Sequence, residues 1–253
     1  MRKPIIAGNW KMNMSIEESK GFVSEFLTLV NDDGAIEKVD ICIATPYLQL
    51  ATVASSLEAT PIIVAAQNVS EHDSGAYTGE ISSKMLKEVG ITTALVGHSE
   101  RRQYFGDTDE SVALKTAKAL ENSITPIVCI GETKEERESN KTKDVIKKQV
   151  LAVFSKVDDA TKIIIAYEPV WAIGTGLTAT SEQAQEVHAF IRSLVKERYG
   201  EAASEKVRIL YGGSANPKNI EELLSQPDID GGLVGGASLK ADSFSQMVLI
   251  AAK

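Results

Sequence analysis

Short runs of β-branched and other apolar residues recur along the chain and alternate with segments of helical periodicity. The runs stop after a few residues, and within them apolar and polar residues do not alternate, which is typical of parallel strands buried on both faces. We therefore expect strands in eight runs: residues 5–10, 39–44, 61–66, 92–96, 126–130, 162–167, 207–211 and 231–234.

The intervening segments begin with helix-start signals. Ser15 and Glu18 have the spacing of a capping box, as do Thr180 and Gln183, and each pair precedes apolar residues at helical spacing. The dipeptide Asn216-Pro217 predicts an N-cap followed by proline in the first helical position. Each of these helices is expected to cover a sheet with one apolar face.

Strand and helix thus alternate about eight times over 253 residues, with no polar linker that would divide the chain. This favours an α/β protein with one domain, residues 1–253, folded as a (β/α)8 barrel. An open doubly wound sheet remains as an alternative. A dinucleotide-binding version of that sheet is less favoured, because no G-x-G-x-x-G motif follows the first strand.

Composition limits the classes of function. Hydrophobic residues make up 43% of the chain and charged residues 25%, as in ordinary soluble proteins. The net charge of −8, without a block of basic residues, disfavours nucleic-acid binding. Cys42 and Cys129 lie in apolar runs and form no C-x-x-C pair, so we expect buried reduced thiols and no metal site. No apolar run approaches the roughly 18 residues of a membrane span. We expect a cytoplasmic protein.

In a (β/α)8 barrel the functional residues follow the carboxyl ends of the strands. Asn9 and Lys11 stand at the end of the first run, and Trp10 between them lets both face the same side. A lone lysine there is more often a solvated surface residue. As part of a set, Lys11 predicts positive charge at the barrel mouth.

Two further residues with catalytic chemistry follow later strands. His98 stands at a strand-to-helix junction, where a helix N-terminus disfavours a proton on the imidazole and favours a neutral ring. Glu168 precedes Pro169, which keeps it out of helical conformation and at the end of its strand. Its carboxylate is then free to point into the mouth as a base.

The connection after Glu168, residues 169–176, is long and apolar in its middle. We interpret it as a lid that closes over the substrate, although a loop packed permanently on the barrel is the alternative. Glycines end the last two strands, in Gly212-Gly213-Ser214 and Gly235-Gly236. Backbone N–H groups approach a phosphate closely at glycines, and these two loops are the usual phosphate site of such barrels.

Together these motifs resemble the signatures of the triosephosphate isomerase family. The matching segments are GNWKMN at residues 8–13, GHSERR at 97–102, AYEPVWAIGTG at 166–176 and YGGS at 211–214, and the resemblance covers essentially the whole chain. It implies a cofactor-independent and metal-free isomerase of glycolysis and gluconeogenesis. Such an enzyme interconverts dihydroxyacetone phosphate and D-glyceraldehyde 3-phosphate through an enediolate.

The resemblance also implies a role for individual residues. Glu168 would remove the proton next to the carbonyl, neutral His98 would polarise that carbonyl, and Lys11 would stabilise the enediolate. Asn9 would hold the substrate, and Glu100 would support Lys11. The phosphate would be bound by four residues, the first only after lid closure: Gly174, Ser214, Gly235 and Gly236.

A long loop, residues 67–80, begins at Gln67 and ends at Glu80. It resembles the interlocking dimer loop of the family, which implies a homodimer in which Thr78 reaches the partner's site. A disordered surface loop is the alternative. Two positions depart from the family pattern, Asp107 and Ala215, and neither is expected to touch the chemistry.

Two other functions remain open at this point. Lys11 suits an aldolase that forms a Schiff base with a phosphorylated substrate. The glycine loops also suit a protein that binds phosphoesters without catalysis, but the presence of both His98 and Glu168 gives no reason to prefer it.

Overall fold

The structure, a computed structural model, describes residues 2–30, 34–174 and 178–253. Eight parallel strands close into a barrel in sequence order, and β1 pairs with both β2 and β8. The strands are β1 (Ile5–Asn9), β2 (Asp40–Thr45), β3 (Ile63–Ala66), β4 (Thr93–Val96), β5 (Thr125–Ile130), β6 (Ile164–Tyr167), β7 (Arg208–Tyr211) and β8 (Gly231–Val234). The predicted (β/α)8 barrel is confirmed, and the open sheet is excluded.

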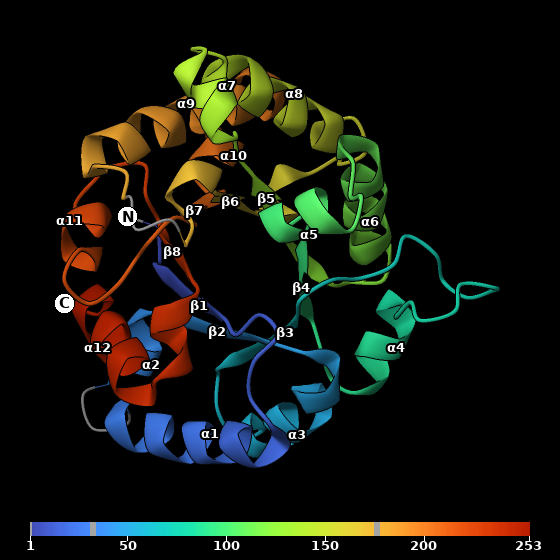
Figure 1. Cartoon of the computed structure of the whole chain (residues 1–253), viewed down its shortest axis with the longest axis vertical. Helices are drawn as coiled ribbons and strands as arrows, with labels where there is room; N and C mark the ends of the chain where they lie inside the picture. The colour runs from blue at the N-terminus through green and yellow to red at the C-terminus, as the bar shows by residue number, and fades with distance from the viewer. Residues whose placement is uncertain (1, 31–33, 175–177) are drawn as a thin grey trace.

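Helices surround the strands as an outer ring (Figure 1). They are α1 (Ile16–Val30), α2 (Ala35–Lys38), α3 (Tyr47–Leu57), α4 (Ser83–Glu88), α5 (Ser99–Tyr104), α6 (Asp109–Glu121), α7 (Lys134–Glu138), α8 (Thr142–Phe154), α9 (Ser181–Tyr199), α10 (Glu201–Ser204), α11 (Ile220–Leu224) and α12 (Ala241–Ala251), with 3-10 turns η1 (Ala160–Lys162), η2 (Val170–Ala172) and η3 (Gly236–Leu239). Within the described part of the chain, no helix has the length and apolar character needed to cross a membrane.

Two apolar cores follow from the alternation of side chains along each strand. Residues such as Ala7, Cys42 and Leu210 point into the barrel and fill it. The alternate residues, such as Ile6 and Ile43, point outward and pack against the helices. Cys42 and Cys129 are both free and buried, as the sequence predicts. The interior of the barrel is therefore a packed core and not a channel.

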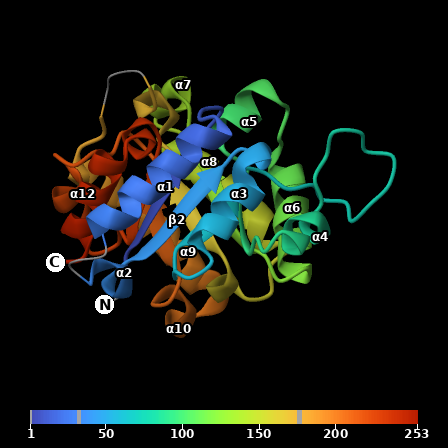
Figure 2. The same ribbon diagram turned by 90° about the horizontal axis from the view of Figure 1, so that it is seen from below.

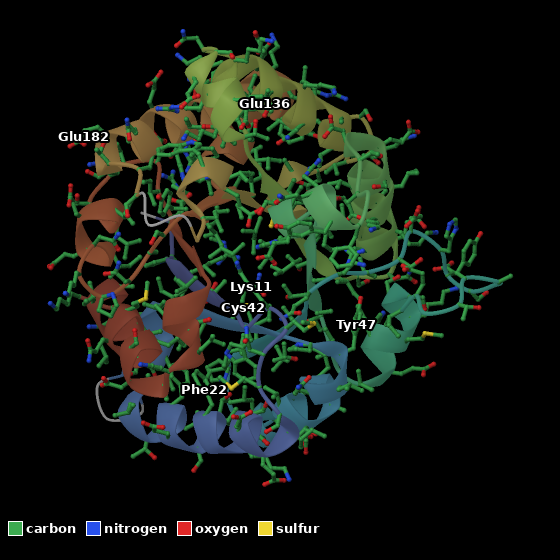
Figure 3. All side chains as sticks on the ribbon, viewed as in Figure 1. Lys11, Phe22, Cys42, Tyr47, Glu136 and Glu182 are labelled. Carbon is green, nitrogen blue, oxygen red and sulfur yellow. The ribbon has the colours of Figure 1, made fainter. Side chains whose placement is uncertain are left out.

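The helix-start signals are mostly confirmed. Ser15 and Glu18 exchange side-chain and backbone hydrogen bonds at the start of α1, and Thr180 and Gln183 do so before α9. On α1, Phe22 packs edge-on against the Trp10 ring at 5.0 Å (Figure 3). This contact fixes the helix against the end of β1, next to the mouth.

The prediction that Asn216-Pro217 opens a helix is confirmed in part, although regular helix α11 begins only at Ile220. The side chain of Asn216 accepts the N–H of Lys218, as an N-cap does, and its carbonyl accepts the N–H of Ile220 at 3.1 Å. A capped turn therefore leads into α11, and the side chain of Asn219 accepts the N–H of Asn216. The turn keeps Asn216 at the barrel mouth.

The connection between β3 and α4 projects from the barrel as a long arm (Figures 1 and 2). Its base is closed by a hydrogen bond from the N–H of Ser70 to the carbonyl of Ile81, at 2.9 Å. Near the tip, the rings of His72 and Tyr77 stack with centroids 3.8 Å apart. The alternative of a disordered loop is therefore not what the structure shows.

Candidate active site

A pocket of about 290 Å³ opens at the carboxyl ends of the strands. Figure 3 shows Lys11 near the middle of the ring of strands. All eight residues predicted to form the site line this one pocket: Asn9, Lys11, His98, Glu168, Gly174, Ser214, Gly235 and Gly236. They come from β1, β4, β6, β7 and β8 and from the segments that follow them, so only the closed barrel brings them together.

Glu168 is fixed at the end of β6 by its backbone and its side chain. Its N–H donates to the carbonyl of Ile130 at 2.7 Å, which continues the β5–β6 ladder by one residue. The side chain is 2% exposed. Its Oε2 accepts the N–H of Ser99 at 2.8 Å, and its Oε1 lies 2.9 Å from Nε2 of His98. Both carboxylate oxygens are thus held by groups that follow β4.

His98 caps the N-terminus of α5 with its ring. The N–H of Glu100 donates to Nδ1 at 3.2 Å, so this nitrogen acts as an acceptor and carries no proton. The proton then resides on Nε2 and is donated to Glu168. With these two hydrogen bonds both ring nitrogens of a neutral imidazole have a partner, and the neutral ring is the form that the sequence predicts.

Burial and charge have opposite effects on the pKa values of this pair. Burial raises the pKa of the Glu168 carboxyl, but His98 and the N–H of Ser99 outweigh it and the net pKa is lowered. Burial lowers the pKa of His98, whereas the Glu168 carboxylate raises it, with a net rise. The N–H that faces Nδ1 opposes full protonation of the ring, so we favour a neutral His98 whose proton is shared with Glu168.

Lys11 is held in a conformation that is uncommon for a residue with a side chain. Its φ angle is 53°, in the left-handed region. Its N–H donates to Oδ1 of Asn9 at 3.0 Å, and its carbonyl accepts from Nε2 of Gln67 at 2.9 Å. The ammonium forms an ion pair with Glu100 at 2.7 Å. Asn9 and Gln67 thus fix the backbone of Lys11, and Glu100 holds its ammonium group at the pocket.

Two glycines allow the Glu168 carboxylate to occupy this position. A Cβ on Gly131 would lie 1.7 Å from the carbonyl oxygen of Glu168, and a Cβ on Gly212 would lie 2.8 Å from its Cγ. Any larger residue at either position requires Glu168 or its strand to move. The base is thus positioned by the absence of side chains on the two neighbouring strands.

The segment after Glu168 is anchored to one buried acid at its start. Glu132, on the loop after β5, accepts the indole N–H of Trp171 and the hydroxyl of Tyr167, both at 3.0 Å. Arg137 lies 3.6 Å from the same carboxylate oxygen and stacks over the Trp171 ring. Of the expected lid, residues 169–174 are described, and residues 175 and 176 lie outside the described residues.

The anion-binding side of the pocket is formed mostly by backbone. Ser214 follows β7, and Gly235 and Gly236 follow β8 at the start of the turn η3. A Cβ on Gly235 would touch the Lys11 side chain at 3.5 Å, whereas a Cβ on Gly236 would meet nothing within 4 Å. The lysine side chain and these loops therefore lie close enough to act on one anion.

The sequence does not identify every residue that shapes the site. Glu132 and Asn216 have no predicted site role, although Glu132 closely follows the fifth strand. Gly212 was predicted only as part of a phosphate loop, and its contact with Glu168 was not predicted. Of the two departures from the family pattern, Asp107 is away from the pocket and binds Arg101 and Lys115. Ala215, expected to lie apart from the chemistry, is in the wall of the pocket next to Ser214.

Comparisons with known proteins agree with this geometry. The family model described as triosephosphate isomerase matches residues 4–251. A triosephosphate isomerase of Alkaliphilus metalliredigens is 50% identical over 250 residues, which cover 98% of this chain and 99% of the relative. One from Alkaliphilus oremlandii is 51% identical over 246 residues, covering 96% and 98%, and one from Trichlorobacter lovleyi is 50% identical over 250 residues, covering 98% of each.

Proposed function

The chain belongs to the triosephosphate isomerase family, and we propose how its residues divide the work of the reaction. The reaction interconverts dihydroxyacetone phosphate and D-glyceraldehyde 3-phosphate, a step of glycolysis. It moves a proton between adjacent carbons and requires a base and an electrophile, and the chemistry involves no redox carrier. The single observation that supports the proposal is the 2.9 Å contact between Glu168 and His98 inside a pocket that also contains Lys11.

Glu168 is the base that removes the proton next to the carbonyl. In the present arrangement it accepts the Nε2 proton of His98. When substrate binds, its carbonyl oxygen accepts the hydrogen bond from Nε2 of His98 in place of Glu168. Glu168 then loses a contact that lowers its pKa. Substrate binding therefore makes the carboxylate more basic at the moment when it is needed.

His98 and Lys11 stabilise the negative charge that develops on the substrate oxygens. A neutral His98 donates from Nε2 to the carbonyl oxygen and then exchanges protons between the two oxygens of the enediolate. The ammonium of Lys11, ion-paired with Glu100, faces the same pocket and acts on the enediolate and on the phosphate. Asn9 orients the substrate and, through its Oδ1, the backbone of Lys11.

The phosphate is bound by backbone groups of Ser214, Gly235 and Gly236, with Gly174 joining them when the lid closes. Closure excludes water from the enediolate, which otherwise loses its phosphate. It also strips water from Glu168, which raises the basicity of the carboxylate further. The lid thus contributes to protection of the intermediate and to proton removal.

The aldolase alternative is disfavoured by the geometry around Lys11. A Schiff base requires a free neutral amine, and the Lys11 amine is engaged as an ammonium in a 2.7 Å ion pair with Glu100. Borohydride treatment in the presence of substrate is expected to leave Lys11 unmodified. A trapped adduct at Lys11 would favour the aldolase.

The assignment of the base is tested with Glu168→Gln, which keeps the shape of the side chain and removes its basicity. We expect kcat to fall by at least about a thousandfold in a coupled assay of glyceraldehyde 3-phosphate turnover, within the range that general bases contribute. Glu136→Gln is the matched control, because Glu136 caps the short helix α7 on the surface. An inactive wild type, or equal rates for the two variants, would contradict the proposal.

We also propose a cytoplasmic homodimer assembled through the arm at residues 67–80. Large apolar side chains are exposed around its base and tip, among them Leu48 at 83%, Tyr77 at 44% and Met85 at 50%. Such a group of exposed apolar residues is typical of an interface. Sedimentation velocity at micromolar concentration is expected to show a dimer. A fully active monomer would contradict this assembly.

A further inference from the structure

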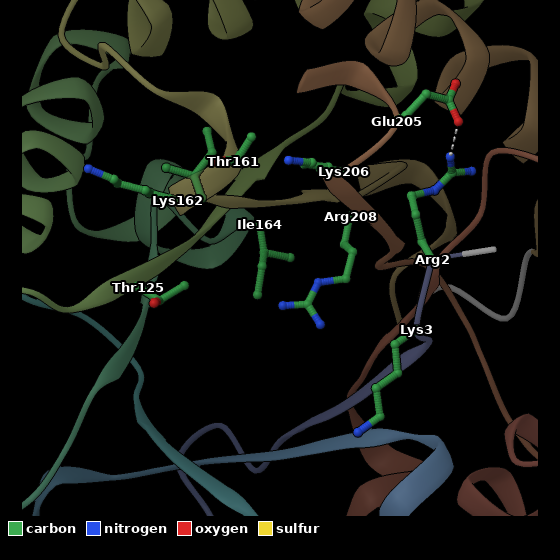
Figure 4. Close-up of a pocket in the computed structure, with 10 residues that line it drawn as sticks. Arg2, Lys3, Thr125, Thr161, Lys162, Ile164, Glu205, Lys206 and Arg208 are labelled. Atoms are coloured by element: carbon green, nitrogen blue, oxygen red, sulfur yellow. Dashed lines mark hydrogen bonds and ion pairs between the residues drawn. The ribbon is translucent and has the colours of Figure 1, made fainter. Parts of the chain in front are cut away.

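The opposite end of the barrel carries a second cavity, with a volume of about 540 Å³ (Figure 4). It lies where β5, β6 and β7 begin, and its wall includes Thr125, Ile164 and Arg208, which belong to these strands. The packed interior of the barrel separates it from the catalytic pocket. It is therefore a separate space, and the isomerase reaction assigns it no role.

The wall of this cavity is basic in a protein that is acidic overall. Its cationic residues are Arg2, Lys3, Lys162, Lys206 and Arg208, whereas Glu205 is its single acidic residue among those described. The chain as a whole has a net charge of −8. A concentration of positive charge in one hollow of an acidic surface produces a local attraction for anions.

Part of this charge is already neutralised by neighbouring acids, and part remains available. Arg2 contacts Asp230 and Glu205, and Asp40 binds both Lys3 and Arg208. Within the described chain, Arg208 contacts Asp40 through Nη1 alone.

Lys162 and Lys206 form no ion pair within the described ranges 2–30, 34–174 and 178–253. The nearby Asp159 has a lowered pKa mainly because Thr161 donates to it, with smaller contributions from these lysines. Figure 4 shows Lys206 reaching across toward Thr161 and Arg208 extending between Ile164 and Lys3, while the side chain of Lys162 extends away from Lys206 and Arg208.

We propose that this cavity binds a compact polyanion that carries two or more phosphate groups. A guanidinium with free donors and two unpaired ammonium groups are the side chains that recognise phosphate. No aromatic residue is among the ten that line the cavity in the described chain, so its wall offers no aromatic ring on which a nucleobase could stack. The excess of positive over negative groups favours a ligand with more than one negative charge.

The test uses inorganic pyrophosphate as the probe, in metal-free buffer, with methyl-labelled protein observed by NMR. Ile163 and Ile164 line the basic cavity, and Leu233 lines the catalytic pocket, so the two sites are read separately. We expect saturable shifts of the two isoleucine methyls. Shifts confined to Leu233, or none that saturate, would overturn the proposal.

Variants determine whether the lysines bind the probe. Lys162→Gln with Lys206→Gln is expected to raise Kd at the isoleucine methyls roughly tenfold, because the double variant removes two exposed cationic groups of the cavity wall. The control pair, Lys20→Gln with Lys147→Gln, changes the net charge equally at exposed positions outside the cavity and is expected to leave Kd unchanged. Equal Kd values for the two pairs would overturn the site.

Orthophosphate distinguishes a polyanion from a single phosphate. We expect it to bind the cavity at least tenfold more weakly than pyrophosphate, because it carries fewer charges to match the basic wall. Equal affinity of the two probes would contradict the preference for a polyanion. All four lysine positions are exposed, so these variants are expected to fold like the wild type, which equal Tm values would verify.

Discussion

Replacing Gly212 with alanine is expected to disturb the catalytic base without adding or removing any functional group. The new Cβ would lie 2.8 Å from Cγ of Glu168 and 3.1 Å from the carbonyl oxygen of Tyr167. The backbone cannot easily retreat, because the N–H of Gly212 donates to that same carbonyl at 2.7 Å. The side chain of Glu168 is therefore the part that moves.

The size of the effect follows from the size of this displacement. Ordinary contacts begin near 3.4 Å, so Cγ moves by about 0.6 Å and the carboxylate, further along the side chain, by about as much or more. A misplacement of about 1 Å in a catalytic group costs on the order of a hundredfold in rate. We expect kcat to fall roughly 30- to 100-fold. KM is expected to change much less, because Ser214, Gly235 and Gly236 are unaltered.

The control is Gly232→Ala on the neighbouring strand. Its Cβ would meet Ile220 and Val234 at 3.5 Å, which is ordinary van der Waals contact. Both variants are assayed by coupled glyceraldehyde 3-phosphate turnover, at a temperature at which thermal unfolding shows each to be folded. A kcat for Gly212→Ala within threefold of that for Gly232→Ala would refute the reasoning.

Two further predictions concern buried polar groups outside the pocket. Burial lowers the pKa of His188 to about 3. Protons therefore bind the unfolded chain more readily than the folded protein. The contribution of the neutral His188 to stability is complete above about pH 6.5 and is lost as the pH falls below that value. At pH 5.5 this loss of stability is on the order of 1 kcal/mol. Urea unfolding of His188→Gln is expected to lack this pH-dependent loss, and an unchanged pH dependence would contradict the prediction. Changing Arg192 to methionine is expected to cost about 3–5 kcal/mol, because Asp228 loses its ion-pair partner and the buried Asp230 keeps only Arg2. The same measurement on the exposed Arg198→Met provides the comparison, and a loss below about 1 kcal/mol at Arg192 would count against the prediction.

The barrel and the predicted site residues were accessible from sequence because each depends on a local pattern. Buried strands show as apolar runs, and Glu168 is placed at a strand end by the proline that follows it. Once the strands are parallel and closed, residues at their carboxyl ends come together without further information. The pocket thus follows from the fold and the strand boundaries.

Features that depend on contacts between distant segments were not accessible in this way. The role of Glu132 requires knowledge that Tyr167 and Trp171 both reach it, and Gly212 matters only because Glu168 lies against it. The helix-start signal at Asn216 gives the capping bond but not the residue at which regular helix α11 begins. Sequence predicts which elements form, and tertiary contacts decide where each one begins.

The pairing of β1 with β8 has a consequence for when activity can first appear. Lys11 is synthesised early and Gly235 near the end of the chain, yet they line one pocket. Ribosomal synthesis at about 5–20 residues per second leaves the unpaired side of β1 without its partner for some tens of seconds. Such pairing of distant segments also makes folding slow. The nascent chain therefore stays inactive and exposed to aggregation until its last strand emerges, and a chaperone that shields β1 during this interval would raise the yield of active enzyme.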